Sequence, residues 1–210
     1  MTTMLAATRV VLATRNHHKV GELRAILADV CDELGLEIVG ASEWPDAPDV
    51  VEDEVTFEGN ARLKAVALAQ HTGLPALADD SGLAVEVLGG APGIFSARWA
   101  GRHGDDQANL ELLLAQLADV KDEHRAAAFV CAAVLALPDG TLRATEGRLA
   151  GHVAREAKGS NGFGYDPILV VEGGQRHAAE LSPEEKNTVS HRGEAFRAMA
   201  PHLRELLTRP

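Results

Sequence analysis

The amino-acid sequence predicts an α/β fold built on a mixed β-sheet. Short apolar runs typical of buried strands alternate with segments whose apolar residues recur at helical spacing. Two longer apolar runs, 126–137 and 141–150, are separated by Pro138-Asp139-Gly140, which is typical of a hairpin turn. A hairpin makes its two strands antiparallel, whereas strands joined through helices are usually parallel. A mixed sheet is therefore expected rather than a wholly parallel one.

The elements are expected to alternate along most of the chain. Strands are predicted at 10–13, 37–39, 74–78, 126–137, 141–150 and 168–171. Helices are predicted at 17–30, 57–71, 106–120 and 194–207. Asn16 and Thr56 are candidate N-caps, and Ser182-Pro183-Glu184-Glu185 is a capping box with proline at the first helical position. The residues expected to face the core are Val20, Leu23, Leu27 and Val30 in the first helix and Leu63, Val66 and Ala67 in the second.

Length and charge limit the classes of protein. The 210 residues predict a single domain, 1–210. The net charge of −11 argues against a nucleic-acid binder, although a local basic cluster or a metal ion can still attract a small anion. No run approaches the ~18 apolar residues of a membrane span, and Met1–Leu12 lacks the features of a signal peptide. A cytoplasmic protein with two free thiols, Cys31 and Cys131, is expected.

The first candidate site lies between the first strand and the first helix, at 14–19. A helix N-terminus presents unpaired N–H groups and a partial positive charge, which suits a phosphate. The segment is Thr14-Arg15-Asn16-His17-His18-Lys19. Lys19 lies in the first helical turn, and Thr14 and Asn16 add hydrogen-bond donors. Taken alone, this segment is more simply explained as an ordinary capped helix.

Carboxylates form the second and third candidates. Glu52, Asp53 and Glu54 precede a helix on which Asn60 and Lys64 lie one turn apart. Asp79-Asp80 follows an apolar strand, where charge is costly unless the carboxylates hold a metal or share a proton. The alternatives are a solvated acidic loop, an exposed helix face and an acidic turn. Asp80-Ser81-Gly82 also fits the aspartic-protease motif, which a second copy of the chain would have to complete.

Two further candidates lie near the C-terminus. In the segment 159–167, glycines space Phe163 and Tyr165, and an aromatic ring beside glycine can stack on a flat ligand. Lys186, His191 and Arg192 can donate hydrogen bonds to the oxygens of a base or a phosphate. Taken alone, the segment 159–167 is explained equally well by turn chemistry. The segment from Lys186 to Arg192 is explained more simply as a polar helix end.

The order of these motifs is far more specific than any one of them. T-R-N-x-x-K, E-x-x-x-T-F-x-x-N-A-x-L-K-A, A-D-D-S-G-L-x-V, L-G-G-A-P-G-I-x-S-A-R, G-F-G-Y-D-P and E-K-x-x-x-S-H-R-G follow one another between about Val10 and Phe196. Together they resemble the inosine triphosphate pyrophosphatase family. The resemblance implies hydrolysis of ITP, dITP and XTP to the monophosphate and pyrophosphate, which removes these nucleotides from the pool available for DNA and RNA synthesis. It also implies a homodimer and an elongated mixed sheet whose helices form two lobes around a central active-site cleft.

The resemblance also implies roles for the matching residues. Thr14 to Lys19 would bind the triphosphate, Glu52 and Asp80 would hold Mg²⁺, and Asp80 would be the catalytic proton acceptor. The remaining substrate-binding positions implied are Asn60, Lys64, Ser81, Phe163, Gly164, Tyr165, Asp166, Lys186, His191 and Arg192. Water activated by the metal or by Asp80 would attack the α-phosphorus. Arg192 would donate to the 6-oxo group of the base, where adenine has an amino group.

Two positions depart from the family pattern. Arg15 replaces the glycine of the usual T-G-N turn, so either the turn needs no positive φ or Arg15 contributes a phosphate contact. Asp53-Glu54 replaces the usual T-G after Glu52, so one of these acids could take over the metal role. A nucleotide sensor without turnover, a pyrophosphatase for pyrimidine triphosphates and a dimeric aspartic protease remain alternative functions.

Overall fold

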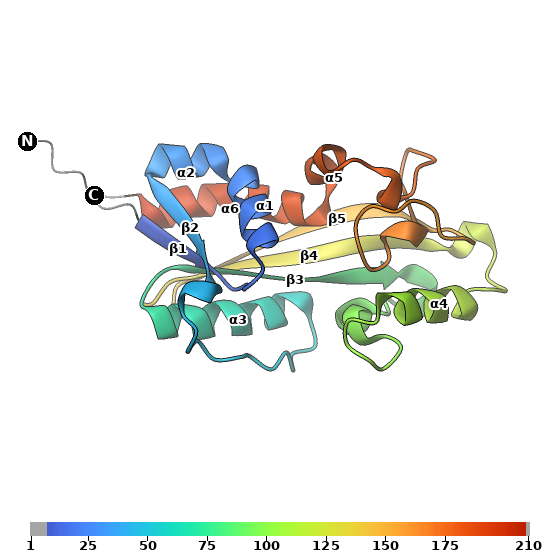
Figure 1. Cartoon of the computed structure of the whole chain (residues 1–210), viewed down its shortest axis with the longest axis horizontal. Coiled ribbons are helices and arrows are strands. Elements are labelled where there is room, and N and C mark those ends of the chain that lie inside the picture. Colours follow the sequence, from blue (N-terminus) through green and yellow to red (C-terminus); the bar gives the residue numbers. More distant parts are fainter. Residues whose placement is uncertain (1–7, 209–210) are drawn as a thin grey trace, which may run out of the picture. The chain divides into compact units, whose positions relative to one another are not determined.

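A computed structural model describes residues 8–208 and confirms a mixed α/β fold. Six strands form a single sheet in the order β2-β1-β3-β4-β5-β6. Their bounds are Thr8–Leu12 (β1), Leu36–Gly40 (β2), Ala76–Val85 (β3), Ala126–Ala136 (β4), Leu142–Val153 (β5) and Leu169–Val171 (β6). Strand β1 pairs in parallel with β2 and with β3, whereas β5 pairs antiparallel with β6. The predicted mixed sheet is therefore correct (Figure 1).

The helices connect and follow these strands. Their bounds are His17–Ile26 (α1), Ala28–Leu34 (α2), Phe57–Thr72 (α3), Asp106–Gln116 (α4), Pro183–Val189 (α5) and His191–Leu207 (α6). The predicted N-caps are confirmed, because Asn16 accepts from the His18 N–H and Thr56 from the Gly59 N–H. The capping box of Ser182 and Glu185 is also present at the start of α5. Among residues 8–208, no helix is both long and apolar enough to cross a membrane.

The chain divides into two compact units. Unit 1 comprises the chain up to Asp80 with 132–146 and 195 onward, and unit 2 comprises 81–131 with 147–194. The chain passes from one unit to the other within β3, β4 and β5. Strand β3 makes this passage between Asp80 and Ser81, so these two adjacent candidate residues belong to different units.

In unit 1, helix α3 packs through small side chains on one face of the sheet, and α2 and α6 lie on the other (Figure 1). The buried residues of α3 include Ala61, Ala65, Leu68 and Ala69, which join Val11 and Ala76 of the strands in one core cluster. The predicted inward residues Leu63, Val66 and Ala67 are only half-buried. The prediction placed Leu63 and Val66 inward because they are large and apolar. The alanines are buried instead, because their small side chains let the helix backbone approach the sheet closely.

The predicted first helix, 17–30, is in fact two helices. Leu27 leaves helical geometry at φ −103° and ψ 14°, ends α1 and precedes α2. Its N–H still bonds the Leu23 carbonyl, and its own carbonyl accepts from Cys31. All four predicted core residues of this segment are nevertheless buried.

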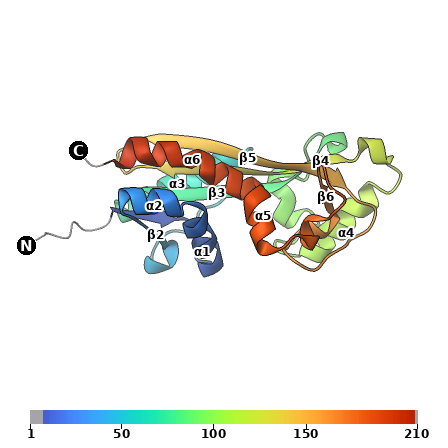
Figure 2. The ribbon, with the colours of Figure 1, turned by 90° about the horizontal axis from the view of Figure 1, so that it is seen from above.

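Several other boundaries also differ from the prediction. Strand β3 continues through Asp79 and Asp80 to Val85, so the paired acids lie within a strand and not after it. Helix α4 ends at Gln116, where the following Leu117 N–H bonds back to the last turn. Helix α6 begins at His191 rather than at 194. In unit 1 this helix runs beside β5, and the Ala195 carbonyl accepts from the Thr145 hydroxyl (Figure 2).

Unit 2 has its own core around α4. Leu110 and Leu113 pack with Leu83, Phe129 and Ile168 from three other segments. Arg125 is buried beside this core and donates to the carbonyls of Val153, Leu117 and Ala154 at 2.7, 2.6 and 2.8 Å. Burial lowers the pKa of this guanidinium. The cysteines are free thiols as predicted, and burial raises the pKa of the Cys31 thiol.

Candidate functional site

Two polar side chains of α3 contact Asp80. The nearest partner is Asn60 of α3, which is fully buried at 0% exposure. Its Nδ2 donates to Asp80 Oδ2 at 3.1 Å, and its Oδ1 accepts from the Glu54 backbone N–H at 3.0 Å. One amide thus holds both the strand carboxylate and the acidic loop before α3. A buried carboxamide that uses donor and acceptor in this way positions its neighbours.

Lys64 lies one turn further along α3 and contacts two carboxylates. Its Nζ is 3.0 Å from Glu52 Oε1 and 3.9 Å from Asp80 Oδ1. The side chains are largely shielded, with 18% of Lys64 and 15% of Asp80 exposed. Glu52 and Asp80 therefore approach a single cation from two segments of the chain.

This pair of carboxylates has the donor set that Mg²⁺ uses. Within the described residues there is no group of three or more His, Cys, Asp or Glu side chains arranged around a metal. Mg²⁺ is usually bound through one or two carboxylates together with substrate phosphates, so a two-carboxylate site is sufficient. Glu52 and Asp80 fit this requirement because they lie close enough together for one cation, the Lys64 ammonium, to contact both.

The structure separates Glu52 from its two acidic neighbours. Glu54 faces Arg62, with Oε1 3.4 Å from Nη2, and its backbone N–H is bound by Asn60. Asp53 is exposed. Among these three acids, the pairing with Lys64 is made by Glu52, which favours Glu52 over its neighbours for the proposed metal role.

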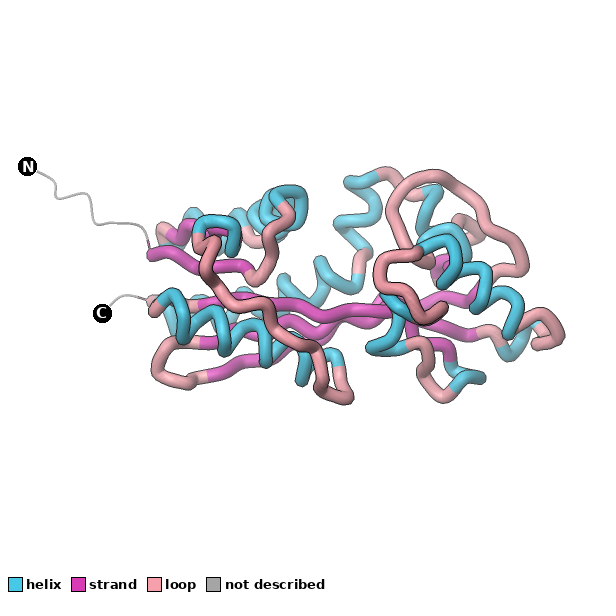
Figure 3. The backbone as a smooth tube through the Cα atoms, turned by 60° about the horizontal axis from the view of Figure 1, so that its bottom comes forward, coloured by secondary structure: helices cyan, strands magenta, loops and turns pink. Residues whose placement is uncertain are grey.

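A cavity of about 360 Å³ lies in unit 1 between the turn after β1 and α3. Thr14, Arg15 and Lys64 line it together with 47–50 of the loop that leads to α3, which runs alongside that helix in Figures 1 and 3. A volume of this size accommodates a small polyanion. Lys64 thus belongs both to the carboxylate pair and to the wall of the cavity.

Arg15 does not require the glycine that it replaces. No non-glycine residue of the described chain has a positive φ, so the turn takes a conformation open to any L-residue. The guanidinium donates to Asp49 Oδ1 at 2.5 Å and to the Ala47 carbonyl at 3.0 Å. Arg15 therefore ties the turn after β1 to the loop that forms the other wall of the cavity.

The rest of the predicted phosphate turn is organised by local caps. Thr14 Oγ1 accepts from the Asn16 N–H at 3.1 Å, and Asn16 Oδ1 accepts from the His18 N–H at 2.9 Å. His17 and His18 are exposed and Lys19 is half-buried. The first turn of α1 carries no acidic residue that would repel an anion at its positive end.

In unit 2, a second cluster gathers around Asp166, whose side chain is 4% exposed. Its Oδ2 accepts from the Phe163 N–H at 2.8 Å and forms a short ion pair with Lys186 Nζ. The same ammonium lies 5.4 Å from the centroid of the Phe163 ring. Gly162 has φ +77°, and a Cβ there would collide with the Asp166 carboxylate. The loop therefore depends on glycine at this position.

Tyr165 attaches this loop to the hydrophobic core of unit 2. It is 4% exposed, and its hydroxyl donates to the Ser96 carbonyl at 2.8 Å. Burial, with a smaller contribution from Asp106, raises the pKa of this phenol well above its usual value. The Gly164 N–H donates to Asp106 Oδ2 at 3.0 Å. Phe163, in contrast, is 66% exposed and is the aromatic ring that this loop presents to solvent.

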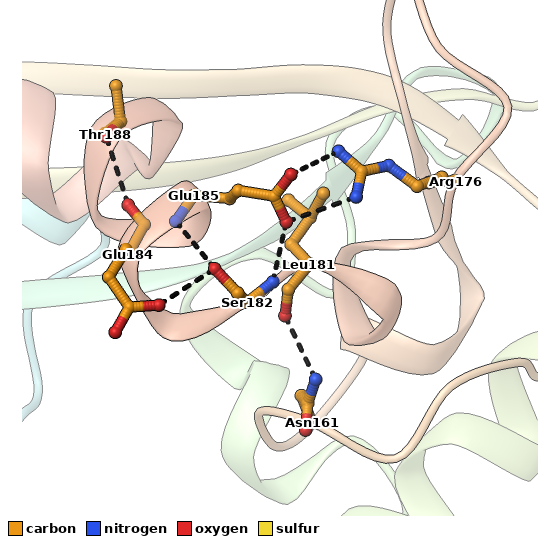
Figure 4. A network of polar contacts seen from close by, with 7 residues as sticks. All are labelled: Asn161, Arg176, Leu181, Ser182, Glu184, Glu185 and Thr188. Carbon is orange, nitrogen blue, oxygen red and sulfur yellow. Dashed lines mark hydrogen bonds and ion pairs between the residues drawn. The ribbon is translucent and has the colours of Figure 1, made fainter.

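Helix α5 is attached to the same loop by polar contacts (Figure 4). Asn161 Nδ2 donates to the Leu181 carbonyl at 3.1 Å, next to the capping box of Ser182 and Glu185. Arg176 forms two hydrogen bonds with Glu185, at 3.1 and 2.8 Å, and this contact lowers the pKa of that carboxyl. These contacts fix the start of the helix that carries Lys186.

The remaining predicted residues lie at the junction of α5 and α6 and at the unit boundary. The His191 ring stacks on Phe129, with centroids 5.1 Å apart and planes 18° apart. Buried Ser190 accepts from the Gly193 N–H at 3.0 Å. Arg192, the next residue of α6, and Ser81, the first residue of unit 2, are both half-buried.

Sequence reasoning missed several residues that hold these clusters in place. Asp49, Ser96, Asp106 and Phe129 each contact a predicted residue from a distant segment. Ser96 lies in the L-G-G-A-P-G-I-x-S-A-R motif, whose position between two other motifs was the available signal. The others carried no signal, because a lone acid or phenylalanine in a loop, a helix start or a strand is commonplace.

Fold and site together define an α/β protein with a small-anion cavity beside a pair of carboxylates suited to a divalent cation. The Ham1 family model matches residues 10–202, and the chain belongs to this family. A dITP/XTP pyrophosphatase of Streptomyces coelicolor is 66% identical over 200 residues, which cover 95% of this chain and 99% of that protein.

Solved structures are similar over nearly the whole chain. A crystal structure of a nucleoside-triphosphatase / dITP/XTP pyrophosphatase from Mycobacterium abscessus is 52% identical, with a TM-score of 0.78 over 92% of this chain and 100% of that one. A HAM1 protein from Coxiella burnetii is 41% identical, with a TM-score of 0.86 over 94% of this chain and 99% of that one.

Proposed function

We propose that this protein hydrolyses the non-standard purine nucleoside triphosphates ITP, dITP and XTP to the monophosphate and pyrophosphate. The observation that carries the proposal is the convergence of Glu52 and Asp80 on one cation beside a cavity of polyanion size. The names of the similar proteins supply the substrate class, since the relative from Streptomyces coelicolor is a dITP/XTP pyrophosphatase. The consequence for the cell is removal of these nucleotides before polymerases use them.

Glu52 and Asp80 would hold Mg²⁺, which screens the negative charge of the triphosphate and so favours attack on phosphorus. Asp80 accepts the proton of the attacking water, and Asn60 orients its carboxylate by donating to Oδ2. The water attacks the α-phosphorus and pyrophosphate leaves. Lys19, Lys64 and the start of α1 offset the charge on the leaving phosphates. Without such local cations, the net charge of −11 would repel the substrate.

The loop of unit 2 would bind the base. Phe163 is exposed and stacks on the purine, while Tyr165 and Asp166 hold the loop in shape from its buried side. Lys186, His191 and Arg192 are the donors proposed to recognise the oxo groups of hypoxanthine and xanthine. A donor facing the 6-position discriminates against adenine, whose amino group leaves both donors unpaired at about 1–3 kcal/mol each.

We further propose a single catalytic domain, 1–210, that acts as a cytoplasmic homodimer on free nucleotides and binds neither nucleic acid nor membrane. The acidic net charge supports the exclusion of nucleic acid. Size-exclusion chromatography with light scattering measures the oligomeric state directly.

The test of the activity is product analysis with Mg²⁺ and, separately, ITP, XTP, dITP, ATP, GTP and UTP. Pyrophosphate and monophosphate from the deaminated purines, with little product from ATP, is the expected result. Phosphate and diphosphate as products would place attack at the γ-phosphorus and refute the mechanism. Binding of nucleotides without turnover would indicate a sensor, and preference for UTP would indicate a pyrimidine enzyme.

A further inference from the structure

Lys64 occupies the position between two carboxylates where the proposed function needs a divalent cation. Its Nζ lies 3.0 Å from Glu52 and 3.9 Å from Asp80. An ammonium with 18% side-chain exposure is stabilised there by its two anionic neighbours. The same two carboxylates would be stabilised by Mg²⁺, so the ammonium and the metal interact with the same oxygens.

Asp80 and the acidic loop before α3 are also held by contacts that do not involve Lys64. Asn60 holds Asp80 through Oδ2, and it holds the loop that carries Glu52 through the Glu54 N–H. Loss of the ammonium would therefore remove a positive charge from beside Glu52 and Asp80 while these contacts of Asn60 remain. A site already assembled in this way binds a divalent cation without further ordering of the chain.

The Lys64 side chain also borders the cavity, where its ammonium could contact phosphate. It lines the cavity with Thr14 and Arg15, where the proposed function places the leaving phosphates. The stem of lysine is long and flexible, so its ammonium is not confined to one position. A polyanion in the cavity would attract it away from Glu52 and Asp80.

We infer that Lys64 is an internal counter-cation that competes with the divalent metal in the nucleotide-free protein and moves to the phosphates when the triphosphate binds. The inference rests on the proposed function and adds a coupling between the two ligands. Metal binds weakly while Lys64 pairs with Glu52 and Asp80, and strongly once the nucleotide removes it. By linkage, metal and nucleotide strengthen each other's binding by the same factor.

The experiment measures binding of Mn²⁺ to nucleotide-free protein by electron paramagnetic resonance, in wild type and Lys64→Met. Methionine keeps most of the length of the side chain and removes its charge. The matched control is Arg62→Met on the same helix, because Arg62 pairs with Glu54 and contacts neither Glu52 nor Asp80 in its ion pair. Lys64→Met is expected to bind Mn²⁺ roughly 10- to 100-fold more tightly, because the metal no longer has to displace a hydrogen bond between an ammonium and a carboxylate. Arg62→Met is expected to change the affinity less than about threefold.

Unchanged or weaker Mn²⁺ binding in Lys64→Met would overturn the inference. A second measurement covers the case in which that variant fails to fold. The same nucleotide-free titration is made on Lys64→Gln, which also removes the charge and is expected to show a comparable gain in Mn²⁺ affinity over wild type. Equal affinities would overturn the inference. Wild-type pyrophosphate release from ITP tests the proposed function separately: release with an unchanged Lys64→Met affinity refutes only the competition, whereas absence of release refutes the activity.

Discussion

Each unit of the molecule contains a lysine paired with a carboxylate, and the two pairs are built differently. In unit 2, Asp166 Oδ2 accepts from both Lys186 Nζ and the Phe163 N–H, and Gly162 lies so close that a Cβ there would collide with this carboxylate. In unit 1, the Lys64 ammonium is shared between Glu52 and Asp80 and borders a cavity. A buried carboxylate that is bonded to its own loop in this way holds the loop in shape. A carboxylate that shares its cation beside a cavity can exchange that cation for a ligand.

This difference predicts that removal of charge in unit 1 acts on turnover more than on folding. Asp80→Asn is expected to lower pyrophosphate release from ITP by about 10²–10⁴-fold, because an amide cannot accept the proton of water. The amide can still bond with Asn60, so the thermal unfolding midpoint should change little. The control is Asp53→Asn, an exposed neighbour of Glu52 in the acidic loop, for which less than about a threefold loss is expected. Full activity of Asp80→Asn would refute the role of this residue.

The loop of unit 2 should respond in the opposite way, with a large effect on stability. Gly162→Ala is expected to lower the free energy of unfolding by about 1–3 kcal/mol, because the methyl group collides with Asp166 at a residue with positive φ. Urea unfolding measures the change. Gly173→Ala is the matched control, since its φ is +74° but a Cβ there meets nothing within 4 Å. Equal losses in the two variants would show that backbone strain alone matters and that the fit around Asp166 does not.

The smallest effect is expected at Tyr165, which supports the same loop from the core. Tyr165→Phe should lower the free energy of unfolding by about 1 kcal/mol, through loss of one hydrogen bond to Ser96. The chain has a single tyrosine, so its ionisation can be followed by ultraviolet absorbance without overlap from another phenol.

The pH dependence of that phenol has a definite sign. The native state raises the tyrosine pKa above its ordinary value of 10.0, so the native state favours the neutral form. Its contribution to stability is complete below pH 10.0 and is lost as pH rises above that value. Tyrosinate absorbance is therefore expected to appear together with unfolding at alkaline pH. Ionisation near pH 10.0 in protein that remains folded would contradict the buried position.

Much of the local structure could be predicted because it depends on neighbouring residues. Asn16, Thr56 and Ser182 begin helices through hydrogen bonds spanning two or three positions, and Pro138-Asp139-Gly140 connects two strands by a short turn. The candidate segments could be named from their residue types, such as the acids before α3 and the pair Asn60 and Lys64 one turn apart on it. Their order along the chain carried the family resemblance.

The boundary of β3 could not be predicted in this way. Asp79 and Asp80 were expected to end the strand, because charge is unfavourable within a sheet. They lie inside it because Asp80 finds Asn60 and Lys64 on a helix some twenty positions earlier. The inward face of α3 was assigned wrongly for a similar reason, since its alanines are buried by strands distant in sequence.

The sequence by itself determined which chemical groups this protein has and where its helices begin, because caps, turns and apolar periodicity act over a few residues. Tertiary structure alone decided which carboxylate shares Lys64, why Arg15 turns to Asp49, and that Tyr165 is a buried support while Phe163 faces solvent. Each of these depends on a partner brought close by packing of distant segments. The energy of a buried polar group is set by that partner, which local sequence does not specify.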